Sequence, residues 1–199
     1  QTYFWAGNVG ASAHDPASAA QDLVQTVFGG RFTSMLNTEL RIKSGLSYGA
    51  RASLQRLAQP GSASFSSFTR TDATAQALDL AFATLARLHE TGIDADTLTS
   101  AKRYVLGQFA PDYETSGQLA SAITSLALYG QSREQIDGYG PRIEAASADD
   151  VAAARRIFAT SDDTLLVAIG DAAKIRDAVS RYGEVTEMKL SDPGFAPVK

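Results

Sequence analysis

Residues that commonly bind metals or act as nucleophiles are scarce in this chain, which has two histidines and no cysteine in 199 residues. His14 precedes Asp15-Pro16 in an expected surface loop, and His89 lies near the expected end of a helix. A zinc pair on a helix needs two histidines four residues apart, and this spacing does not occur. We therefore predict no metal site in this chain, and we interpret His89 as a residue placed by the helix dipole or by solvent.

Other chemical motifs are also incomplete. Gly29-Gly30-Arg31-Phe32 lacks the Gly-Lys-Ser/Thr ending of a phosphate-binding loop and the three spaced glycines of a dinucleotide site. The two glycines are better explained as the end of one helix and the start of the next. No nucleophile elbow surrounds any serine. The acidic residues are scattered, mostly at helix starts, where carboxylates cap backbone N–H groups. We therefore predict no catalytic residue in this chain.

The segment from Gly29 to Tyr48 has a more specific pattern. A Gly-Gly pair is followed by a helix with Leu36-Asn37, then by Leu40-Arg41 and by Gly45-Leu46-Ser47-Tyr48. This order resembles the C-terminal domain of the pitrilysin/insulinase zinc peptidases. Later landmarks of that domain follow in order, so the resemblance covers essentially the whole chain: Ala101-Lys102 in a helix, the helix start Ser147-x-x-Asp150-Val151, and a strand ending in Gly170-Asp171.

The resemblance implies a substrate-binding role for Arg41 and Tyr48. Members of the family hydrolyse peptides with a zinc ion held by an inverted His-x-x-Glu-His motif, whose Glu is the general base. In this family an Arg and a Tyr from the opposite half donate hydrogen bonds to the substrate beside the scissile bond, and here these positions are Arg41 and Tyr48. The alternative is that Arg41 caps the C-terminus of its own helix electrostatically and that Tyr48 is an ordinary sheet aromatic.

The inverted zinc motif occurs nowhere in this chain. The resemblance therefore implies that zinc belongs to a partner, a homologous domain or subunit carrying His-x-x-Glu-His, and that the two halves enclose an unfolded peptide. The competing hypothesis is a non-peptidase structural subunit, like the core subunits of the respiratory cytochrome complex. A third is an unrelated soluble interaction domain. Retention of both Arg41 and Tyr48 favours the peptidase assembly.

Composition limits the other classes of function. The net charge of -4 and the pI near 5.2 argue against a nucleic-acid surface, which needs clustered Lys and Arg. No apolar run approaches the ~18 residues of a membrane span. The chain opens on Gln1-Thr2-Tyr3-Phe4-Trp5, which is typical of a strand interior, so we expect a piece of a longer protein. Usage rich in Ala, Arg and Asp suggests a bacterial protein, and the family resemblance, whose bacterial members often act outside the cytoplasm, then implies the periplasm as the expected compartment.

Hydrophobic periodicity predicts the elements that must position Arg41 and Tyr48. A helix is expected over 32–43, and Gly45 is expected to end it in the left-handed conformation. The other expected helices cover 20–28, 78–88, 98–109, 116–129, 147–158 and 171–179. The expected strands cover 2–9, 48–57 and 62–69, a buried central strand at 165–169, and a closing strand at 184–190. This order predicts one α+β domain over residues 1–199, a mainly antiparallel sheet with helices packed on one face.

Overall fold

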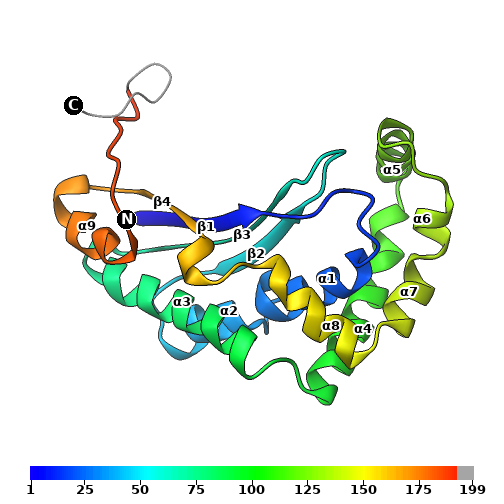
Figure 1. Cartoon of the computed structure of the whole chain (residues 1–199), viewed down its shortest axis with the longest axis horizontal. Coiled ribbons are helices and arrows are strands. Elements are labelled where there is room, and N and C mark those ends of the chain that lie inside the picture. Colours follow the sequence, from blue (N-terminus) through cyan, green and yellow to red (C-terminus); the bar gives the residue numbers. More distant parts are fainter. Residues whose placement is uncertain (192–199) are drawn as a thin grey trace.

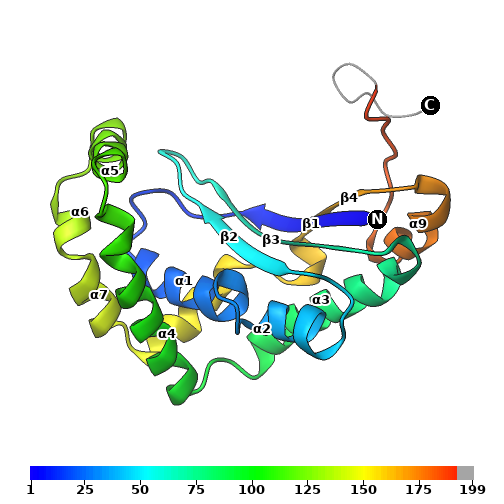
Figure 2. The same cartoon turned by 180° about the vertical axis from the view of Figure 1, so that it is seen from behind.

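Four strands form an antiparallel sheet in the order β2-β3-β1-β4 within residues 1–191, the part of the chain that this computed structural model describes. The strands are β1 Thr2–Val9, β2 Ala50–Gln55, β3 Ser62–Thr69 and β4 Leu165–Ile169. The α-helices are α1 Ser18–Gln25, α2 Met35–Asn37, α3 Thr74–Glu90, α4 Ala95–Phe109, α5 Ser116–Leu128, α6 Glu134–Asp137, α7 Tyr139–Ala145, α8 Ala148–Ala154 and α9 Ala172–Val179. Helices lie against one face of the sheet (Figures 1 and 2), so the predicted α+β fold is confirmed.

The core lies between the sheet and the helices packed beneath it. Alternate side chains of β1 and β3 point into this layer, and Phe4 and Phe65 are among those buried there. Phe65 makes edge-on contacts with Phe28, which follows α1, and with Phe82 of α3, at ring-centroid distances of 5.6 Å each. Phe158 packs on Phe28 at 4.9 Å. Aromatic contacts thus join segments far apart in the chain to one sheet face.

Several local predictions are confirmed. Gly45 has φ +63, the left-handed conformation expected after the helix that carries Arg41. Ser147 and Asp150 form a capping box at the start of α8, with reciprocal side-chain to backbone hydrogen bonds. The predicted helix at 32–43 begins as α2 and continues as a π-helical turn, Thr38–Lys43. Helical turns of this wide type often mark functional segments.

The strand predicted as buried and central is at the edge of the sheet. β4 pairs only with β1 among the described residues, and none of its five side chains is buried. The prediction was wrong because a continuous apolar run suggests burial on both faces. Here Leu165, Val167 and Ile169 lie exposed on the face of the sheet opposite the helices.

Two further predictions, one at the C-terminus and one in the middle of the chain, need correction or qualification. Residues 184–190 do not form the expected closing strand, since only an isolated bridge residue, Met188, occurs there. The tail after residue 191 lies outside the described residues. The helix expected at 116–129 is present as α5, but its apolar stripe, which includes Leu119 and Ile123, is exposed within the described part of the chain. α5 stands apart from the sheet in both views (Figures 1 and 2).

No helix within residues 1–191 is long and apolar enough to span a bilayer.

The first helical segment packs with its backbone very close to that of β2. α1 continues as a π-helical turn, Thr26–Gly30, and Gly29 in this turn lies against β2. A Cβ atom at Gly29 would lie only 2.2 Å from the backbone nitrogen of Ala52. Gln25, one turn earlier, donates a hydrogen bond from Nε2 to the Ala52 carbonyl at 2.8 Å. The absence of a side chain at Gly29 therefore sets the distance between helix and strand.

We expect Gly29→Ala to destabilise the protein by about 1–3 kcal/mol, because backbone must move to admit the new methyl group. The matched control is Gly107→Ala in the exposed interior of α4, where an added Cβ meets nothing within 4 Å. There alanine should stabilise by about 0.5–1 kcal/mol, its usual advantage over glycine in a helix. Chemical denaturation of both variants measures the changes, and shifts of the same sign would contradict the packing argument.

Candidate functional site

Arg41 lies over two aromatic rings. Its guanidinium carbon lies 4.9 Å from the ring centre of Phe32 and 4.6 Å from the ring centre of Tyr48, both within cation–π range. The Tyr48 residue is 77% exposed and Phe32 is 59% exposed, while Arg41 is partly buried. The π-helical turn supplies Arg41, and the segment leading into β2 supplies Tyr48. The structure thus brings together the two residues singled out from the sequence.

The polar atoms of this pair remain available to a ligand. Within residues 1–191, neither the Arg41 guanidinium nor the Tyr48 hydroxyl makes a hydrogen bond or an ion pair. The end of the helix is capped instead by Ser44, whose Oγ lies 2.7 Å from the Glu39 carbonyl and 3.0 Å from the Leu40 carbonyl. Arg41 makes no hydrogen bond to its own helix end, but it lies in the last turn, where its charge faces the helix carbonyls, so the electrostatic alternative stays open. The strand predicted at 48–57 is shorter, Ala50–Gln55, so Tyr48 precedes it.

The loop that carries Tyr48 is anchored by buried hydroxyl groups. Ser67 Oγ, on β3, lies 2.9 Å from Ser47 Oγ and 2.8 Å from the Gly49 carbonyl. Thr69 Oγ1 donates to the Leu46 carbonyl at 2.7 Å. These contacts fix the backbone on both sides of Tyr48, so its exposed ring projects from a rigid base.

Asn37 links the helix to the same corner. Its amide nitrogen donates to the Phe32 carbonyl at 2.7 Å, and its amide oxygen accepts from the backbone N–H of Ala50 at 3.3 Å. Asn37 is buried. One side chain therefore joins the segment that carries Phe32 to the first residue of β2.

Glu39 ties the π-helical turn to α3. Its Oε1 accepts from Lys43 Nζ at 2.9 Å and from Arg87 Nη2 at 3.0 Å. Partial burial opposes ionisation, but the hydrogen bonds and charges of Lys43 and Arg87 outweigh it and hold the pKa of Glu39 below its usual value. The ion pairs position the turn, and Arg41 is left out of them.

The two histidines lie elsewhere. His14 is in the loop before α1, and His89 is in the last turn of α3. The Nε2 atom of His89 is buried without a hydrogen-bond partner in the described structure. No group of three or more His, Cys, Asp or Glu side chains that could hold a metal ion occurs within residues 1–191. The residues described here do not fit the zinc ion of the family.

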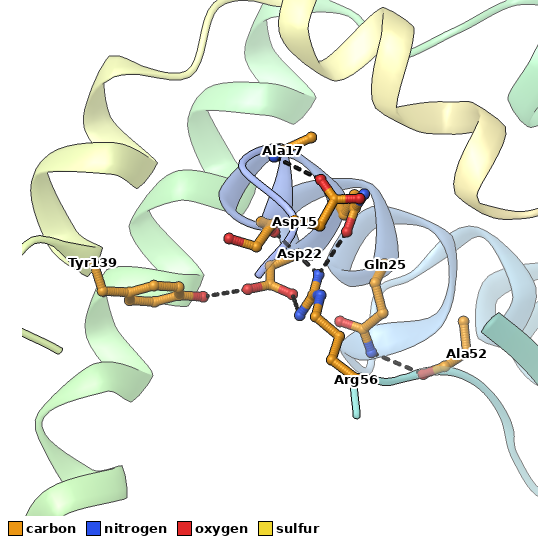
Figure 3. Close-up of polar contacts among 9 residues, drawn as sticks. Asp15, Ala17, Asp22, Gln25, Ala52, Arg56 and Tyr139 are labelled. Atoms are coloured by element: carbon orange, nitrogen blue, oxygen red, sulfur yellow. Dashed lines mark hydrogen bonds and ion pairs between the residues drawn. The ribbon is translucent and has the colours of Figure 1, made fainter. Parts of the chain in front are cut away.

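A second polar cluster is structural. Figure 3 shows Asp22 of α1 between Arg56 and Tyr139: Arg56 Nη1 donates to Asp22 Oδ1 at 2.8 Å, and the Tyr139 hydroxyl donates to Oδ2 at 2.9 Å. Burial and the neighbouring Asp22 carboxylate raise the pKa of Tyr139 well above its usual value. Arg56 also donates to the Ser18 carbonyl and to Gln21. Most donors of this cluster are satisfied internally, so it fastens α1 to α7 and the β2–β3 connection.

Sequence reasoning missed the residues that support Arg41 and Tyr48. Phe32 was interpreted only as a helix start, and Asn37 only as part of the motif. The hydroxyl of Ser67 comes from β3, where serines alternate with buried residues and carry no signal of a special role. The contacts of Asn37 with Ala50 and of Ser67 with Ser47 join positions 13 and 20 residues apart, so local patterns do not reveal them.

Comparison with known proteins gives a consistent family and fold. A family described as "Peptidase M16 inactive domain" matches residues 1–105. A solved M16 inactive domain from Pseudomonas fluorescens superposes with a TM-score of 0.77 at 21% identity, over 84% of this chain and 40% of that one. Among curated proteins, no sequence matches.

Two further solved structures share the fold. An inactive peptidase domain from Bordetella parapertussis matches with a TM-score of 0.72 at 20% identity, over 85% of this chain and 93% of that one. A chain of complex III2 from Candida albicans matches with a TM-score of 0.75 at 14% identity, over 92% of this chain and 46% of that one. This chain thus spans less than half of the Pseudomonas and Candida chains.

We expect Glu39→Gln to lower thermal stability at pH 7 and to lose this effect in acid. A carboxyl group with a depressed pKa stabilises the fold above its unfolded pKa of about 4.3, and the stabilisation disappears as the pH falls through the folded pKa. The melting temperatures of the variant and the parent should therefore converge below about pH 4. The control is Asp72→Asn in the exposed Arg70–Asp72 pair. This variant should change the melting temperature little at any pH. An equal difference at pH 3 and pH 7 would contradict the role of Glu39.

Proposed function

Because this chain belongs to the M16 peptidase family as one of its inactive domains, we propose that it is the substrate-binding, zinc-free wall of a two-part zinc metallopeptidase. A non-catalytic half of such a peptidase agrees with the family match and with the similar solved domains. The finer assignment, in which Arg41 and Tyr48 contact an unfolded peptide, rests on the geometry of their corner.

The arrangement of Arg41 carries the proposal. A guanidinium group has five N–H donors and a permanent charge. In the described structure the Arg41 guanidinium lies over the rings of Phe32 and Tyr48, and no described acceptor bonds its N–H groups. The rings restrict the orientation of the side chain but leave its donors free. Such a donor is suited to a peptide carbonyl.

The proposed contribution to catalysis is binding and charge stabilisation. Attack on a peptide bond places negative charge on the carbonyl oxygen, and prearranged donors aimed at this oxygen lower the barrier. Arg41 supplies a charged donor and Tyr48 a directional hydroxyl. Neither residue generates the nucleophile. In this proposal a homologous partner domain or subunit with His-x-x-Glu-His holds the zinc ion and the general base.

The competing function is that of a structural subunit in an assembly without hydrolysis. The likeness to a chain of complex III2 allows this possibility as far as the fold is concerned. What favours the peptidase role is the position of Arg41 over the rings of Phe32 and Tyr48 with its N–H donors unused by described residues. The two functions differ in whether these residues affect turnover.

We expect the purified chain alone to bind no stoichiometric zinc and to cleave no peptide. The chain lacks the inverted motif and cysteine, which leaves too few strong ligands. Metal analysis of chelator-washed protein, with an unstructured fluorogenic peptide as substrate, tests both points. One tightly held zinc ion per chain together with cleavage would overturn the assignment of the metal to a partner.

Mixed with a zinc-bearing homologous half, the chain should support peptide cleavage. In this mixture Tyr48→Phe should lower kcat/KM by about 10²–10³-fold, the usual effect of losing one oxyanion donor. Arg41→Lys keeps the charge but loses the planar fork, so it should also reduce kcat/KM. Both changes leave the core intact, so melting temperatures should stay close to the parent value.

The matched controls are Tyr104→Phe and Arg156→Lys, which alter exposed side chains without hydrogen bonds to described residues. These should retain full turnover. If Tyr48→Phe and Arg41→Lys also retain it, while the mixture depends on the chain, then the residues are structural. If the zinc-bearing half is equally active without the chain, the structural-subunit hypothesis gains.

A further inference from the structure

The two edges of the sheet are protected very differently. On β2 the backbone N–H of Ala50 donates to Asn37 Oδ1, and the carbonyl of Ala52 accepts from Gln25 Nε2, so helical side chains occupy this edge. Within residues 1–191, no hydrogen bond other than the ladder with β1 reaches the backbone of β4. An edge strand with free N–H and C=O groups is a template for another strand.

The side chains of β4 do not discourage such pairing. Natural edges are commonly blocked by charged residues or proline, and β4 has neither in Leu165–Ile169. Leu165 is 73% exposed on the face opposite the helices, and Val167 and Ile169 follow on the same face. On β2 the corresponding face has polar residues, Arg51 and Ser53. Only the β4 edge is apolar.

An apolar groove continues from β4 across this face. It has a volume of about 510 Å³ and is lined by Trp5 and Val9 of β1, by Leu165 and Val167, and by polar backbone and serine groups around Gly7 and Ser62. In the sheet register Trp5 lies opposite Val167, and Gly7 lies opposite Leu165. Tyr3 stacks on Trp5 with ring centres 6.5 Å apart, which extends the apolar surface along β1.

A single carboxylate gives the groove its charge. Asp163 is the one charged residue among the lining side chains, and it makes no ion pair with the described part of the chain. Its neighbour Asp162 is also acidic and also without a salt bridge there. An occupant that presents apolar side chains along β4 and a lysine or arginine near Asp163 would match both features.

We infer that the free edge of β4 binds an extended polypeptide strand with alternating apolar residues and a basic residue at its end. The strand adds to the sheet through backbone hydrogen bonds, and its apolar side chains cover Leu165 and Val167, the exposed side chains of the edge strand. Its basic end pairs with Asp163. This surface is at the opposite sheet edge from β2, about 14 Å away at a strand spacing of 4.8 Å, and does not depend on the role of Arg41.

Charge argues against a second copy of this chain as the occupant. Twofold pairing of β4 with β4 about Val167 would run antiparallel and would place Asp163 of one copy opposite Asp171 of the other, at both ends. Like charges directly across a strand pair are destabilising. The Lys174 side chain near Asp171 is already paired with it, with Nζ and Oδ2 3.0 Å apart. A strand with basic ends meets no such opposition.

The test uses the full chain and a capped synthetic peptide in which valine and threonine alternate between two terminal lysines. Trp5 is the single tryptophan of the protein, so its fluorescence reports binding at the groove. At a peptide concentration of about ten times Kd, the outward amides of β4 should exchange with deuterium about tenfold more slowly. The same peptide with alternate backbone N-methyl groups keeps its side chains and charges but should not bind.

Three variants distinguish binding at the β4 edge from non-specific binding of the peptide. Val167→Lys should weaken binding at least tenfold, because a charge on the apolar edge opposes strand addition. The matched control Ser53→Lys, on the same face of β2, should leave Kd unchanged. Asp163→Asn should weaken binding about two- to fivefold, the size of an exposed ion pair. Unchanged melting temperatures for all three variants establish that the fold is kept.

Three outcomes would overturn the inference. A peptide with terminal glutamates that binds as tightly as the lysine peptide would remove the role of Asp163. Protection of β2 in place of β4 would put the strand at the wrong edge. Dimerisation through β4 in sedimentation, abolished by Val167→Lys, would make a second copy the occupant.

Discussion

The contact between Gly29 and β2 determines much of the geometry of this protein. Because Gly29 has no side chain, the end of the first helical segment lies directly against the backbone of Ala52. The chain must then turn back, and the next helix begins at Met35 beside the same strand. Its π-helical end consequently lies next to the residues that enter β2, and Arg41 meets Tyr48. A larger residue at 29 would move helix and strand apart and would disturb this corner, although it touches neither Arg41 nor Tyr48.

The sequence predicted local features well and long-range surroundings poorly. Gly45 and the Ser147–Asp150 box were predictable because each depends on a few neighbouring residues: a left-handed turn favours glycine, and a capping box needs two side chains three residues apart. The pairing of Arg41 with Tyr48 was accessible only through the family pattern. The contribution of Phe32, and of Ser67 from a distant strand, depends on tertiary packing. The α+β class followed from the order of the elements.

The error over β4 has a physical cause. An apolar strand can be buried on both faces, or it can lie at an edge with one apolar face open, and five residues cannot distinguish these cases. Within the described residues, solvent meets Leu165, Val167 and Ile169, and α5 likewise exposes Leu119 and Ile123. Apolar surface of this extent is costly in water. Two elements that differ from the sequence prediction, β4 and α5, therefore both expose apolar side chains.

The two sheet edges differ in whether side chains bond their outward backbone groups. At β2, the side-chain amides of Asn37 and Gln25 bond two backbone groups of the edge, and buried hydroxyl groups hold the loop of Tyr48. This arrangement costs side-chain freedom but leaves Arg41 with donors that no described residue uses. At β4 the backbone itself is left free, and the carboxylate of Asp163 lies beside apolar side chains. The β2 corner thus presents side-chain donors on a firmly held loop, whereas the β4 edge presents backbone groups unpaired within the described residues, and the sheet keeps these two surfaces apart on opposite edges.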